Sequence, residues 1–282
     1  MISQEVIFAI LLVIASVYAI FDVFNKRNIP NVFVYASLIV AFGITLTYGI
    51  GTIEYSILIA AVSAILGYLL YKKGFIGGGD IVEFIAISLI LPIQPATATY
   101  AAINVQTPFI ISVLLAAGYV VSLYIPIYYL RKTPKKLHMD RNRMLSGTVL
   151  LLSYAVLIAV MYLLSYINAV GVALLGIIGI ASFLIIIFES SIYWGMVSML
   201  MPKELEPGDM IATNLMDKKD LAYFKNKSKN FNRLVTKKLL SEIRGVKKKI
   251  PVYRNSVPFA LFILIGIIIS LLFGNLMLLI IS

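Results

Sequence analysis

The sequence predicts an all-α membrane protein, a polytopic helix bundle that crosses the bilayer several times. The chain has 282 residues, of which 61% are hydrophobic, and its mean hydropathy is +0.97. A soluble domain of this length fills its core with far fewer apolar residues. The apolar residues form long runs, and the basic residues stand between those runs. The excess of apolar surface is therefore expected to face lipid.

The hydrophobic runs predict about six to eight membrane-spanning helices, most simply eight, because a spanning helix needs roughly 20 mostly apolar residues. The runs lie at residues 4–24, 32–50, 55–71, 81–99, 109–130, 144–166, 170–198 and 257–281. The first run has neither a basic region ahead of it nor a small-residue cleavage site. It is therefore expected to be a retained span rather than a removable signal peptide.

The positions of the basic residues predict the orientation of these spans. All 24 Lys and Arg residues lie within 25–31, 72–73, 131–143 and 203–254. If the spans alternate in direction, these segments share one side of the membrane, and that side is the cytoplasm because cytoplasmic loops are enriched in Lys and Arg. We therefore expect a multi-pass protein of the cell membrane. The net charge of +11 is then explained by topology and by attraction to membrane lipids, not by nucleic acid.

Spans and basic segments divide the chain into three parts. These are a transmembrane bundle at 1–200, a cytoplasmic basic segment at 201–256 and a last transmembrane helix at 257–282. Within the basic segment, residues 231–245 have apolar side chains at helical spacing, which predicts an amphipathic helix lying against the membrane surface. Residues 206–209 read Glu-Pro-Gly-Asp, which is typical of a turn.

Composition excludes several kinds of site. The chain has no cysteine, so it has no disulfide, no thiolate metal site and no cysteine nucleophile. No cluster in the sequence has metal-ligand spacing, and Gly77-Gly78-Gly79 lacks the Lys-Ser/Thr pair of a phosphate-binding loop. We therefore expect neither a metal nor a cofactor.

Acidic side chains within or beside the apolar runs are the main candidates for chemistry, because a charge near the bilayer centre costs about 2.5–3.5 kcal/mol or more. Of the 13 acidic residues, four meet this description: Asp22, Asp80, Glu83 and Glu189. Glu83 follows Asp80 by one helical turn, so it either supports Asp80 or is a spectator at the headgroups. For Glu189, deep in a long run, the simple interpretation is a hydrogen bond to a serine or tyrosine of another helix.

The two aspartates each have an ordinary interpretation when taken alone. Asp22 lies at the C-terminal end of its predicted helix, where the macrodipole disfavours an anion, and it could pair with Lys26 or Arg27 at the membrane interface. Asp80 follows three glycines and opens the fourth span, which is typical of a helix N-cap.

As a pair, Asp22 and Asp80 indicate catalysis. The predicted topology puts both at the cytoplasmic ends of their spans and at the same depth. Two carboxylates that approach each other can share a proton and hold a water, so that one acts as base on the water and the other donates to a scissile carbonyl. The pair therefore predicts an aspartic peptidase that works at the cytoplasmic face.

Three motifs resemble the prepilin peptidase family of GxGD aspartic peptidases, in particular its archaeal preflagellin peptidase branch. They are Asp22 followed by Ile29-Pro30-Asn31, the segment Gly77-Gly78-Gly79-Asp80, and Pro258-Phe259-Ala260-Leu261 at the start of the last span. The chain departs from the family pattern at Val82, where the family often has a lysine, and in having more predicted spans than the archaeal branch.

The resemblance implies a function and a set of site residues. Asp22 and Asp80 would be catalytic, the glycines at 77–79 would form a substrate-binding loop, and Glu83, Pro30 and Asn31 would support the site. The implied partners are pilin-like or archaellin-like precursors, which are cut between a short basic leader and the hydrophobic helix that follows it.

Two other functions are compatible with parts of this pattern. A presenilin-like intramembrane protease also has a GxGD motif, but its first aspartate follows a tyrosine, where this chain has Phe21, and Ile29-Pro30-Asn31 favours the prepilin group. An ion-coupled transporter would place its acidic sites near the midplane. That arrangement suits Glu189 but does not suit two aspartates at one face.

Overall fold

The computed structural model describes residues 2–25, 29–72, 76–95, 107–132, 141–228, 231–253 and 257–281. The chain divides into two compact units. The first comprises Met1–Tyr124, Leu151–Ile180 and Pro258–Ser282, and the second comprises Ile125–Leu150 and Ala181–Val257.

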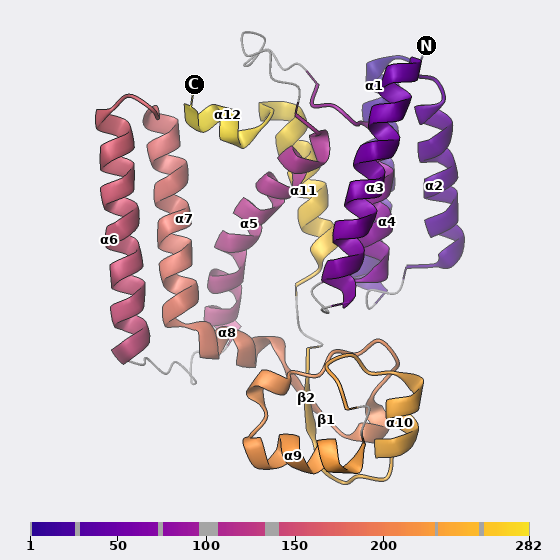
Figure 1. The fold of residues 1–282 in the computed structure, drawn as a ribbon, viewed down its shortest axis with the longest axis vertical. Helices are drawn as coiled ribbons and strands as arrows, with labels where there is room; N and C mark the ends of the chain where they lie inside the picture. The colour runs from indigo at the N-terminus through magenta and orange to yellow at the C-terminus, as the bar shows by residue number, and fades with distance from the viewer. Residues whose placement is uncertain are drawn as a thin grey trace. The chain divides into compact units, whose positions relative to one another are not determined.

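Helices make up most of the described structure (Figure 1). They are α1 (Gln4–Phe24), α2 (Asn31–Thr45), α3 (Ile50–Lys72), α4 (Gly78–Ile90), α5 (Phe109–Lys132), α6 (Arg141–Leu163), α7 (Ala169–Ile187), α8 (Glu189–Met196), α9 (Lys218–Lys227), α10 (Lys237–Ile243), α11 (Phe259–Phe273) and α12 (Leu276–Ile281), with the short 3₁₀ turns η2 (Pro202–Glu204) and η3 (Thr213–Leu215). By length and composition, α1, α3, α5, α6 and α7 can cross a membrane, and α2 and α11 are shorter apolar helices. Each predicted apolar run contains a helix, so the all-α multi-pass membrane fold is confirmed.

Helix α4 ends well before the end of its predicted run. Its last residue is Ile90, and Leu91 precedes a proline, which disfavours the helical conformation at Leu91. The last carbonyl groups of a helix need partners outside it. Here the hydroxyls of Thr45 and Tyr48, from α2 and the turn after it, donate hydrogen bonds to the carbonyls of Leu89 and Ile90. Hydroxyl groups from α2 and from the turn after it thus provide hydrogen-bond partners for the last carbonyl groups of α4.

Two other predicted runs also end differently in the structure. The run at 170–198 is divided at Phe188, whose φ of −101° and ψ of 16° interrupt the helix between α7 and α8. The last span is divided at Gly274, which has a φ of +78°. Glycine adopts that left-handed conformation without the steric penalty of a side chain, so α11 stops there and α12 begins two residues later.

Helix α4 is enclosed by other helices of the first unit. It packs against α1, α2, α3 and α11, which lie beside it in Figure 1. Its buried residues run almost without a break from Glu83 to Ile90. By contrast, α2 and α3 expose large apolar side chains, among them Ile39 and Ile65, as expected of surfaces that face lipid. Polar groups on α4 therefore lie inside protein rather than in lipid.

Helices α5 and α11 approach each other closely at Gly266. A Cβ atom added at Gly266 would lie 2.5 Å from the carbonyl oxygen of Val113 and 3.0 Å from the amide nitrogen of Ala117. Because backbone atoms cannot move aside as a flexible side chain can, Gly266→Ala should lower the melting temperature of the purified protein. The expected loss in the free energy of unfolding is about 1–3 kcal/mol, the usual cost of overpacking. Gly118→Ala, also in α5, meets nothing within 4 Å and serves as the control. Equal melting temperatures for the two variants would contradict this close approach.

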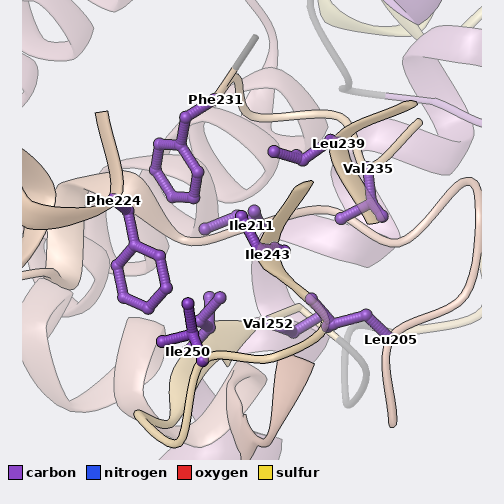
Figure 2. Packing of buried hydrophobic residues seen from close by; sticks show 10 residues of the cluster. Leu205, Ile211, Phe224, Phe231, Val235, Leu239, Ile243, Ile250 and Val252 are labelled. Carbon is purple, nitrogen blue, oxygen red and sulfur yellow. The ribbon is translucent and has the colours of Figure 1, made fainter. Parts of the chain in front are cut away.

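The basic segment of the second unit folds around a small apolar core, shown in Figure 2. Strand β1 (Ser198–Leu200) pairs antiparallel with β2 (Ile250–Val252), and Met199 lies opposite Pro251. The buried residues of the core are Leu205, Ile211, Phe224, Phe231, Val235, Leu239, Ile243, Val246, Ile250 and Val252. They come from α9, α10, β2 and the connecting segments. Burying these side chains stabilises the segment as a folded body.

The amphipathic helix predicted at 231–245 is shorter than expected, and its apolar face is covered by protein. Helix α10 begins after Thr236, whose hydroxyl accepts a hydrogen bond from the Leu239 backbone N–H at 3.2 Å. Leu239 and Ile243 are fully buried in the small core. The prediction that this helix lies against the membrane surface is therefore wrong. Helical spacing indicates that one face is covered, but it does not say whether lipid or protein covers it.

The turn predicted at residues 206–209 is confirmed. The Asp209 backbone N–H donates to the Glu206 carbonyl at 3.1 Å, and the Asp209 carboxylate accepts from the Glu206 backbone N–H at 2.9 Å. Gly208 has a φ of +100°, which glycine adopts at little cost. This turn carries the chain toward the small core.

Candidate active site

Asp22 lies in the last turn of α1 and is largely buried, with 9% of its surface exposed. Its Oδ2 atom accepts a hydrogen bond of 2.9 Å from the backbone N–H of Ala260. Ala260 is the second residue of α11, after the N-cap Pro258. The first N–H groups of a helix have no partner within it and carry a partial positive charge. The start of α11 therefore favours an anion at Asp22, although Asp22 lies at the unfavourable end of its own helix.

The ion pair with Lys26 or Arg27 that the sequence also allowed for Asp22 cannot be checked in the structure. Both basic residues lie outside the described part of the chain. Within the described part, the Asp22 carboxylate is held by a backbone donor from a helix that is 238 residues away in sequence.

Asp80 is the third residue of α4 and is half-buried. Its Oδ2 atom accepts a hydrogen bond of 2.7 Å from the backbone N–H of the N-cap residue Gly77. The capping role expected for Asp80 is thus present, with the carboxylate reaching back from the third helical position as in a capping box. A carboxylate in the first turn also interacts favourably with the helix dipole. Asp22 and Asp80 therefore share one feature, since each accepts a backbone N–H at the start of a helix.

The glycine segment contacts the loop that joins α1 and α2. A Cβ atom added at Gly79 would lie 2.4 Å from Cδ1 of Ile29, so the absence of a side chain at Gly79 makes room for Ile29. Pro30 is the N-cap of α2 and Asn31 is its first residue, and both are exposed. Two of the sequence motifs, at 29–31 and 77–80, are therefore adjacent in the structure.

The other two glycines are more open. Gly77 and Gly78 are exposed, and a Cβ atom at Gly78 would meet nothing within 4 Å. Gly77 contributes its N–H to Asp80. No steric reason in the structure requires glycine at position 78.

Glu83 lies one turn along α4 from Asp80 and is completely buried, with 0% of its surface exposed. The charges of Asp80 and Asp22 both act on it. Within the described structure, neither of its carboxyl oxygens has a hydrogen-bond partner. Glu83 is therefore not a spectator at the headgroups. It joins the two aspartates in one acidic cluster.

Tyr18 is a site residue that the sequence analysis did not identify, and Ala260 appeared there only within the motif at 258–261, without a role. Tyr18 precedes Asp22 by one turn of α1, is fully buried, and makes a hydrogen bond of 2.9 Å with the hydroxyl of Ser37 on α2. Glu83 and Asp80 both act on it electrostatically. The spacing of four residues from Asp22 could have placed Tyr18 on the same face of the helix. Nothing in sequence spacing pointed to the N–H of Ala260.

Phe259 helps to position the start of α11 beside α4. Its ring packs edge-on against Phe84, with ring centroids 6.1 Å apart. Phe84 directly follows Glu83 in the chain. The third sequence motif, at 258–261, thus places a helix N-terminus against both α1 and α4.

Glu189 belongs to a different environment, within the second unit. It opens α8 and forms an ion pair of 3.2 Å with Arg143 of α6, and Arg143 also donates to the Ser190 hydroxyl at 2.9 Å. Glu189 thus makes a polar contact with another helix, as expected, but the expected partner, a serine or tyrosine, is wrong because the partner is Arg143. An acid with this partner explains the charge within the apolar run without an ion-transport site.

No group of three or more His, Asp or Glu side chains in the described ranges is arranged to hold a metal ion. The acidic cluster of Asp22, Asp80 and Glu83 offers carboxyl groups, two of them beside backbone donors, an arrangement suited to acid–base chemistry.

The segment that carries this cluster is similar to a known family. Residues 6–126 match the model of the type IV leader peptidase family, and this stretch contains α1 to α4 and the larger part of α5. No curated protein and no solved structure matches the chain. The matched stretch includes Asp22, Asp80 and Glu83, so it coincides with the helices that form the candidate site. In this stretch, which is less than half of its length, the chain is similar to the type IV leader peptidases, and this similarity supports a hydrolase of the prepilin peptidase kind.

Proposed function

We propose that this protein is a leader peptidase of the aspartic endopeptidase type, in which Asp22 and Asp80 are the catalytic residues. The observation that carries the proposal is that the two carboxylates come from helices α1 and α4, which pack together, and that the charges of both act on one buried side chain, Glu83. The helix N-termini that hold the two carboxylates come from α11 and α4. Fixed backbone donors restrict the position of a carboxylate, which acid–base catalysis requires.

Two such carboxylates can hydrolyse a peptide bond with no net gain or loss of protons at the site. The ionised carboxylate takes a proton from the attacking water, and the protonated one gives its proton to the carbonyl oxygen of the scissile bond. When the intermediate collapses, the first carboxyl returns a proton to the leaving nitrogen and the second takes one from a hydroxyl of the intermediate. Both groups regain their starting states, and one water is consumed.

The proposed substrates are pilin-like or archaellin-like precursors, each with a short basic leader followed by a hydrophobic helix. Such a precursor keeps its leader in the cytoplasm and its helix in the bilayer, so its scissile bond lies at the inner interface. The sequence places Asp22 and Asp80 at that interface, because basic segments follow Asp22 and precede Asp80 and cytoplasmic loops are rich in Lys and Arg. The acidic cluster also suits a substrate whose leader is positively charged.

An extended substrate segment at this depth also needs partners for its backbone. Polar backbone groups that leave water without a hydrogen bond are costly. Gly77 and Gly78 are exposed, and Gly78 and Gly79 open helix α4, where the first N–H groups have no partner within the helix. We assign these glycines to hydrogen bonding with the substrate backbone, although the helical conformation of Gly78 and Gly79 does not suit the loop expected from the sequence.

The proposed function is tested by incubating the purified protein with a model precursor and sequencing the new N-terminus. We expect one cut between the basic leader and the hydrophobic helix. A cut within the hydrophobic helix would instead indicate a presenilin-like intramembrane protease. Failure to cut any precursor of this kind would contradict the substrate assignment.

The orientation of the active site is tested by cysteine labelling, for which the native chain supplies a cysteine-free background. A cysteine at position 168 should react with an impermeant reagent added from outside, and cysteines at 138 and 227 should not. Position 138 lies outside the described residues, whereas Lys227 ends α9 and is exposed. After the membrane is opened, all three should react, which controls for accessibility. The reverse pattern would move both aspartates to the outer face.

A further inference from the structure

The two chain neighbours of Asp80 are both held in close contacts that involve a glycine. Before Asp80, a Cβ atom added at Gly79 would lie 2.4 Å from Cδ1 and 3.4 Å from Cγ1 of Ile29. After Asp80, the side chain of Ile81 meets α3 at Gly67, where an added Cβ atom would lie 3.1 Å from Cγ2 of Ile81. Carbon atoms in contact are normally about 3.5–4.0 Å apart. The start of α4 is therefore packed closely against α3 and against the segment that precedes α2.

The backbone conformation at position 79 does not itself require glycine. Gly79 is the second residue of α4, and of the described glycines only Gly208 and Gly274 have a positive φ. In a helical conformation alanine is more favourable than glycine. What restricts position 79 is therefore the space that Cδ1 of Ile29 occupies.

Ile29 belongs to a segment whose backbone is restricted. It precedes Pro30, and the residue before a proline is confined mainly to extended conformations. Pro30 is the N-cap of α2, and its carbonyl accepts the backbone N–H groups of Phe33 and Val34 at 3.0 and 3.2 Å. The side chain of Ile29 therefore starts from a backbone position that the first turn of α2 fixes.

The first turns of α2 are in turn attached to α1, which carries Asp22 in its last turn. The ring of Phe33 packs edge-on against that of Tyr18, with ring centroids 5.0 Å apart. One turn further along α2, the Ser37 hydroxyl makes a hydrogen bond of 2.9 Å with the Tyr18 hydroxyl. A continuous set of contacts therefore joins the helix of Asp22 to Ile29, and Ile29 to the residue beside the second aspartate.

We propose that Ile29 is a positioning residue, which packs against Gly79 and thereby sets the position of Asp80 relative to Asp22. The proposal rests on the proposed function of the two aspartates. Two carboxyl groups that act on one water and one carbonyl must keep a defined separation, and misplacing a reacting group by about 1 Å can cost about a hundredfold in rate. Ile29 acts through Gly79 and takes no part in proton transfer, so its effect on the rate comes from packing alone.

A pair of substitutions that compensate in size tests this role. In Gly79→Ala the added Cβ atom must displace either Ile29 or the start of α4, so we expect kcat to fall at least about tenfold. Ile29→Val removes Cδ1, and the nearest remaining atom, Cγ1, is then 3.4 Å from the added Cβ. The double variant Ile29→Val/Gly79→Ala should therefore recover most of the lost kcat, and Ile29→Val alone should lower kcat less than Gly79→Ala does. Such recovery is not expected if alanine at position 79 only disturbs hydrogen bonding to the substrate.

Gly51→Ala is the matched control. Gly51 is the second residue of α3, as Gly79 is of α4, and a Cβ atom at Gly51 would meet nothing within 4 Å. This variant should keep the wild-type kcat. Equal kcat values for Gly79→Ala and Gly51→Ala would overturn the proposal, and so would a loss in Gly79→Ala that Ile29→Val does not reduce.

Ile29→Ala keeps the proposal testable if Gly79→Ala does not fold. It removes the contact with Gly79 without adding a clash, so it should lower kcat severalfold. KM should change little, because Ile29 acts on the position of Asp80 rather than on the bound substrate. A folded Ile29→Ala variant with wild-type kcat would overturn the proposal.

Melting temperatures test the contact without any substrate. Gly79→Ala should melt at a lower temperature than Gly51→Ala, and adding Ile29→Val should reduce that difference, because residues in contact show coupled effects on stability. Independent effects of the substitutions at positions 29 and 79 on the melting temperature would overturn the proposal. If the coupling is present but the wild-type protein cuts no precursor, the peptidase assignment and the role of Ile29 in it fail, while the packing of Ile29 against Gly79 stands.

Discussion

Asp22→Asn and Asp80→Asn should each lower kcat for precursor cleavage by at least about a hundredfold, the usual size of an acid–base contribution. A site with one carboxyl group cannot act as base on the water and as acid toward the carbonyl in the same cycle. Asparagine removes the ionisable group but keeps a carbonyl oxygen that can accept the same hydrogen bond. The donor is the N–H of Ala260 for Asp22 and the N–H of Gly77 for Asp80. The measurement is the initial rate of leader removal by purified, correctly inserted protein.

The control for this pair is an aspartate that belongs to the second unit. Asp217→Asn changes the exposed residue before α9 and should leave the rate unchanged. Wild-type turnover by either Asp22→Asn or Asp80→Asn would remove that residue from the catalytic assignment. A loss of activity in Asp217→Asn as well would point to a general effect on the protein rather than to chemistry.

The two aspartates could be predicted from sequence because an acid near an apolar run needs a reason to be there. Asp22 and Asp80 stand at opposite ends of their spans in the sequence, so alternation of the spans predicts that both lie at one face of the membrane. The match of residues 6–126 to the leader peptidase family contains both. The roles of the two residues stay a prediction until variants are measured.

What surrounds the aspartates could not be predicted, because it depends on contacts between distant segments. The N–H of Ala260 reaches Asp22 across 238 residues of chain, and no spacing rule covers such a pair. Glu83 could be placed near Asp80 by helical spacing, but its complete burial depends on how α1, α2, α3 and α11 enclose α4. Periodicity therefore indicates which residues share a face, and only packing decides what that face meets.

The same distinction explains the successes and errors in the fold. Apolar runs predicted where helices lie, because lipid requires backbone groups to be satisfied within each span. The end of α4 at Ile90 depends on hydroxyl groups of Thr45 and Tyr48. The apolar run that contains α4 does not reveal these contacts in the sequence. The apolar face of α10 was assigned to the membrane, whereas Leu239 and Ile243 are buried in a protein core.

Ala260→Pro should lower kcat by about tenfold to a hundredfold, the effect of losing one hydrogen bond to a charged group. Proline has no backbone N–H, so the variant removes the donor that Asp22 accepts at 2.9 Å. Position 260 is the second residue of α11, where the N–H has no partner within the helix and proline does not interrupt the helical hydrogen bonds.

Ala260→Val is the matched control, since it adds a side chain of similar size at the same buried position and keeps the N–H. If the hydrogen bond matters, Ala260→Val should retain most of the activity, while Ala260→Pro should lose it. Equal losses in the two variants would show that crowding at the start of α11, not the missing donor, is responsible. A folded Ala260→Pro variant with wild-type kcat would show that the N–H does not support Asp22. In that case the packing of Phe259 against Phe84 would be what positions α11 beside the site.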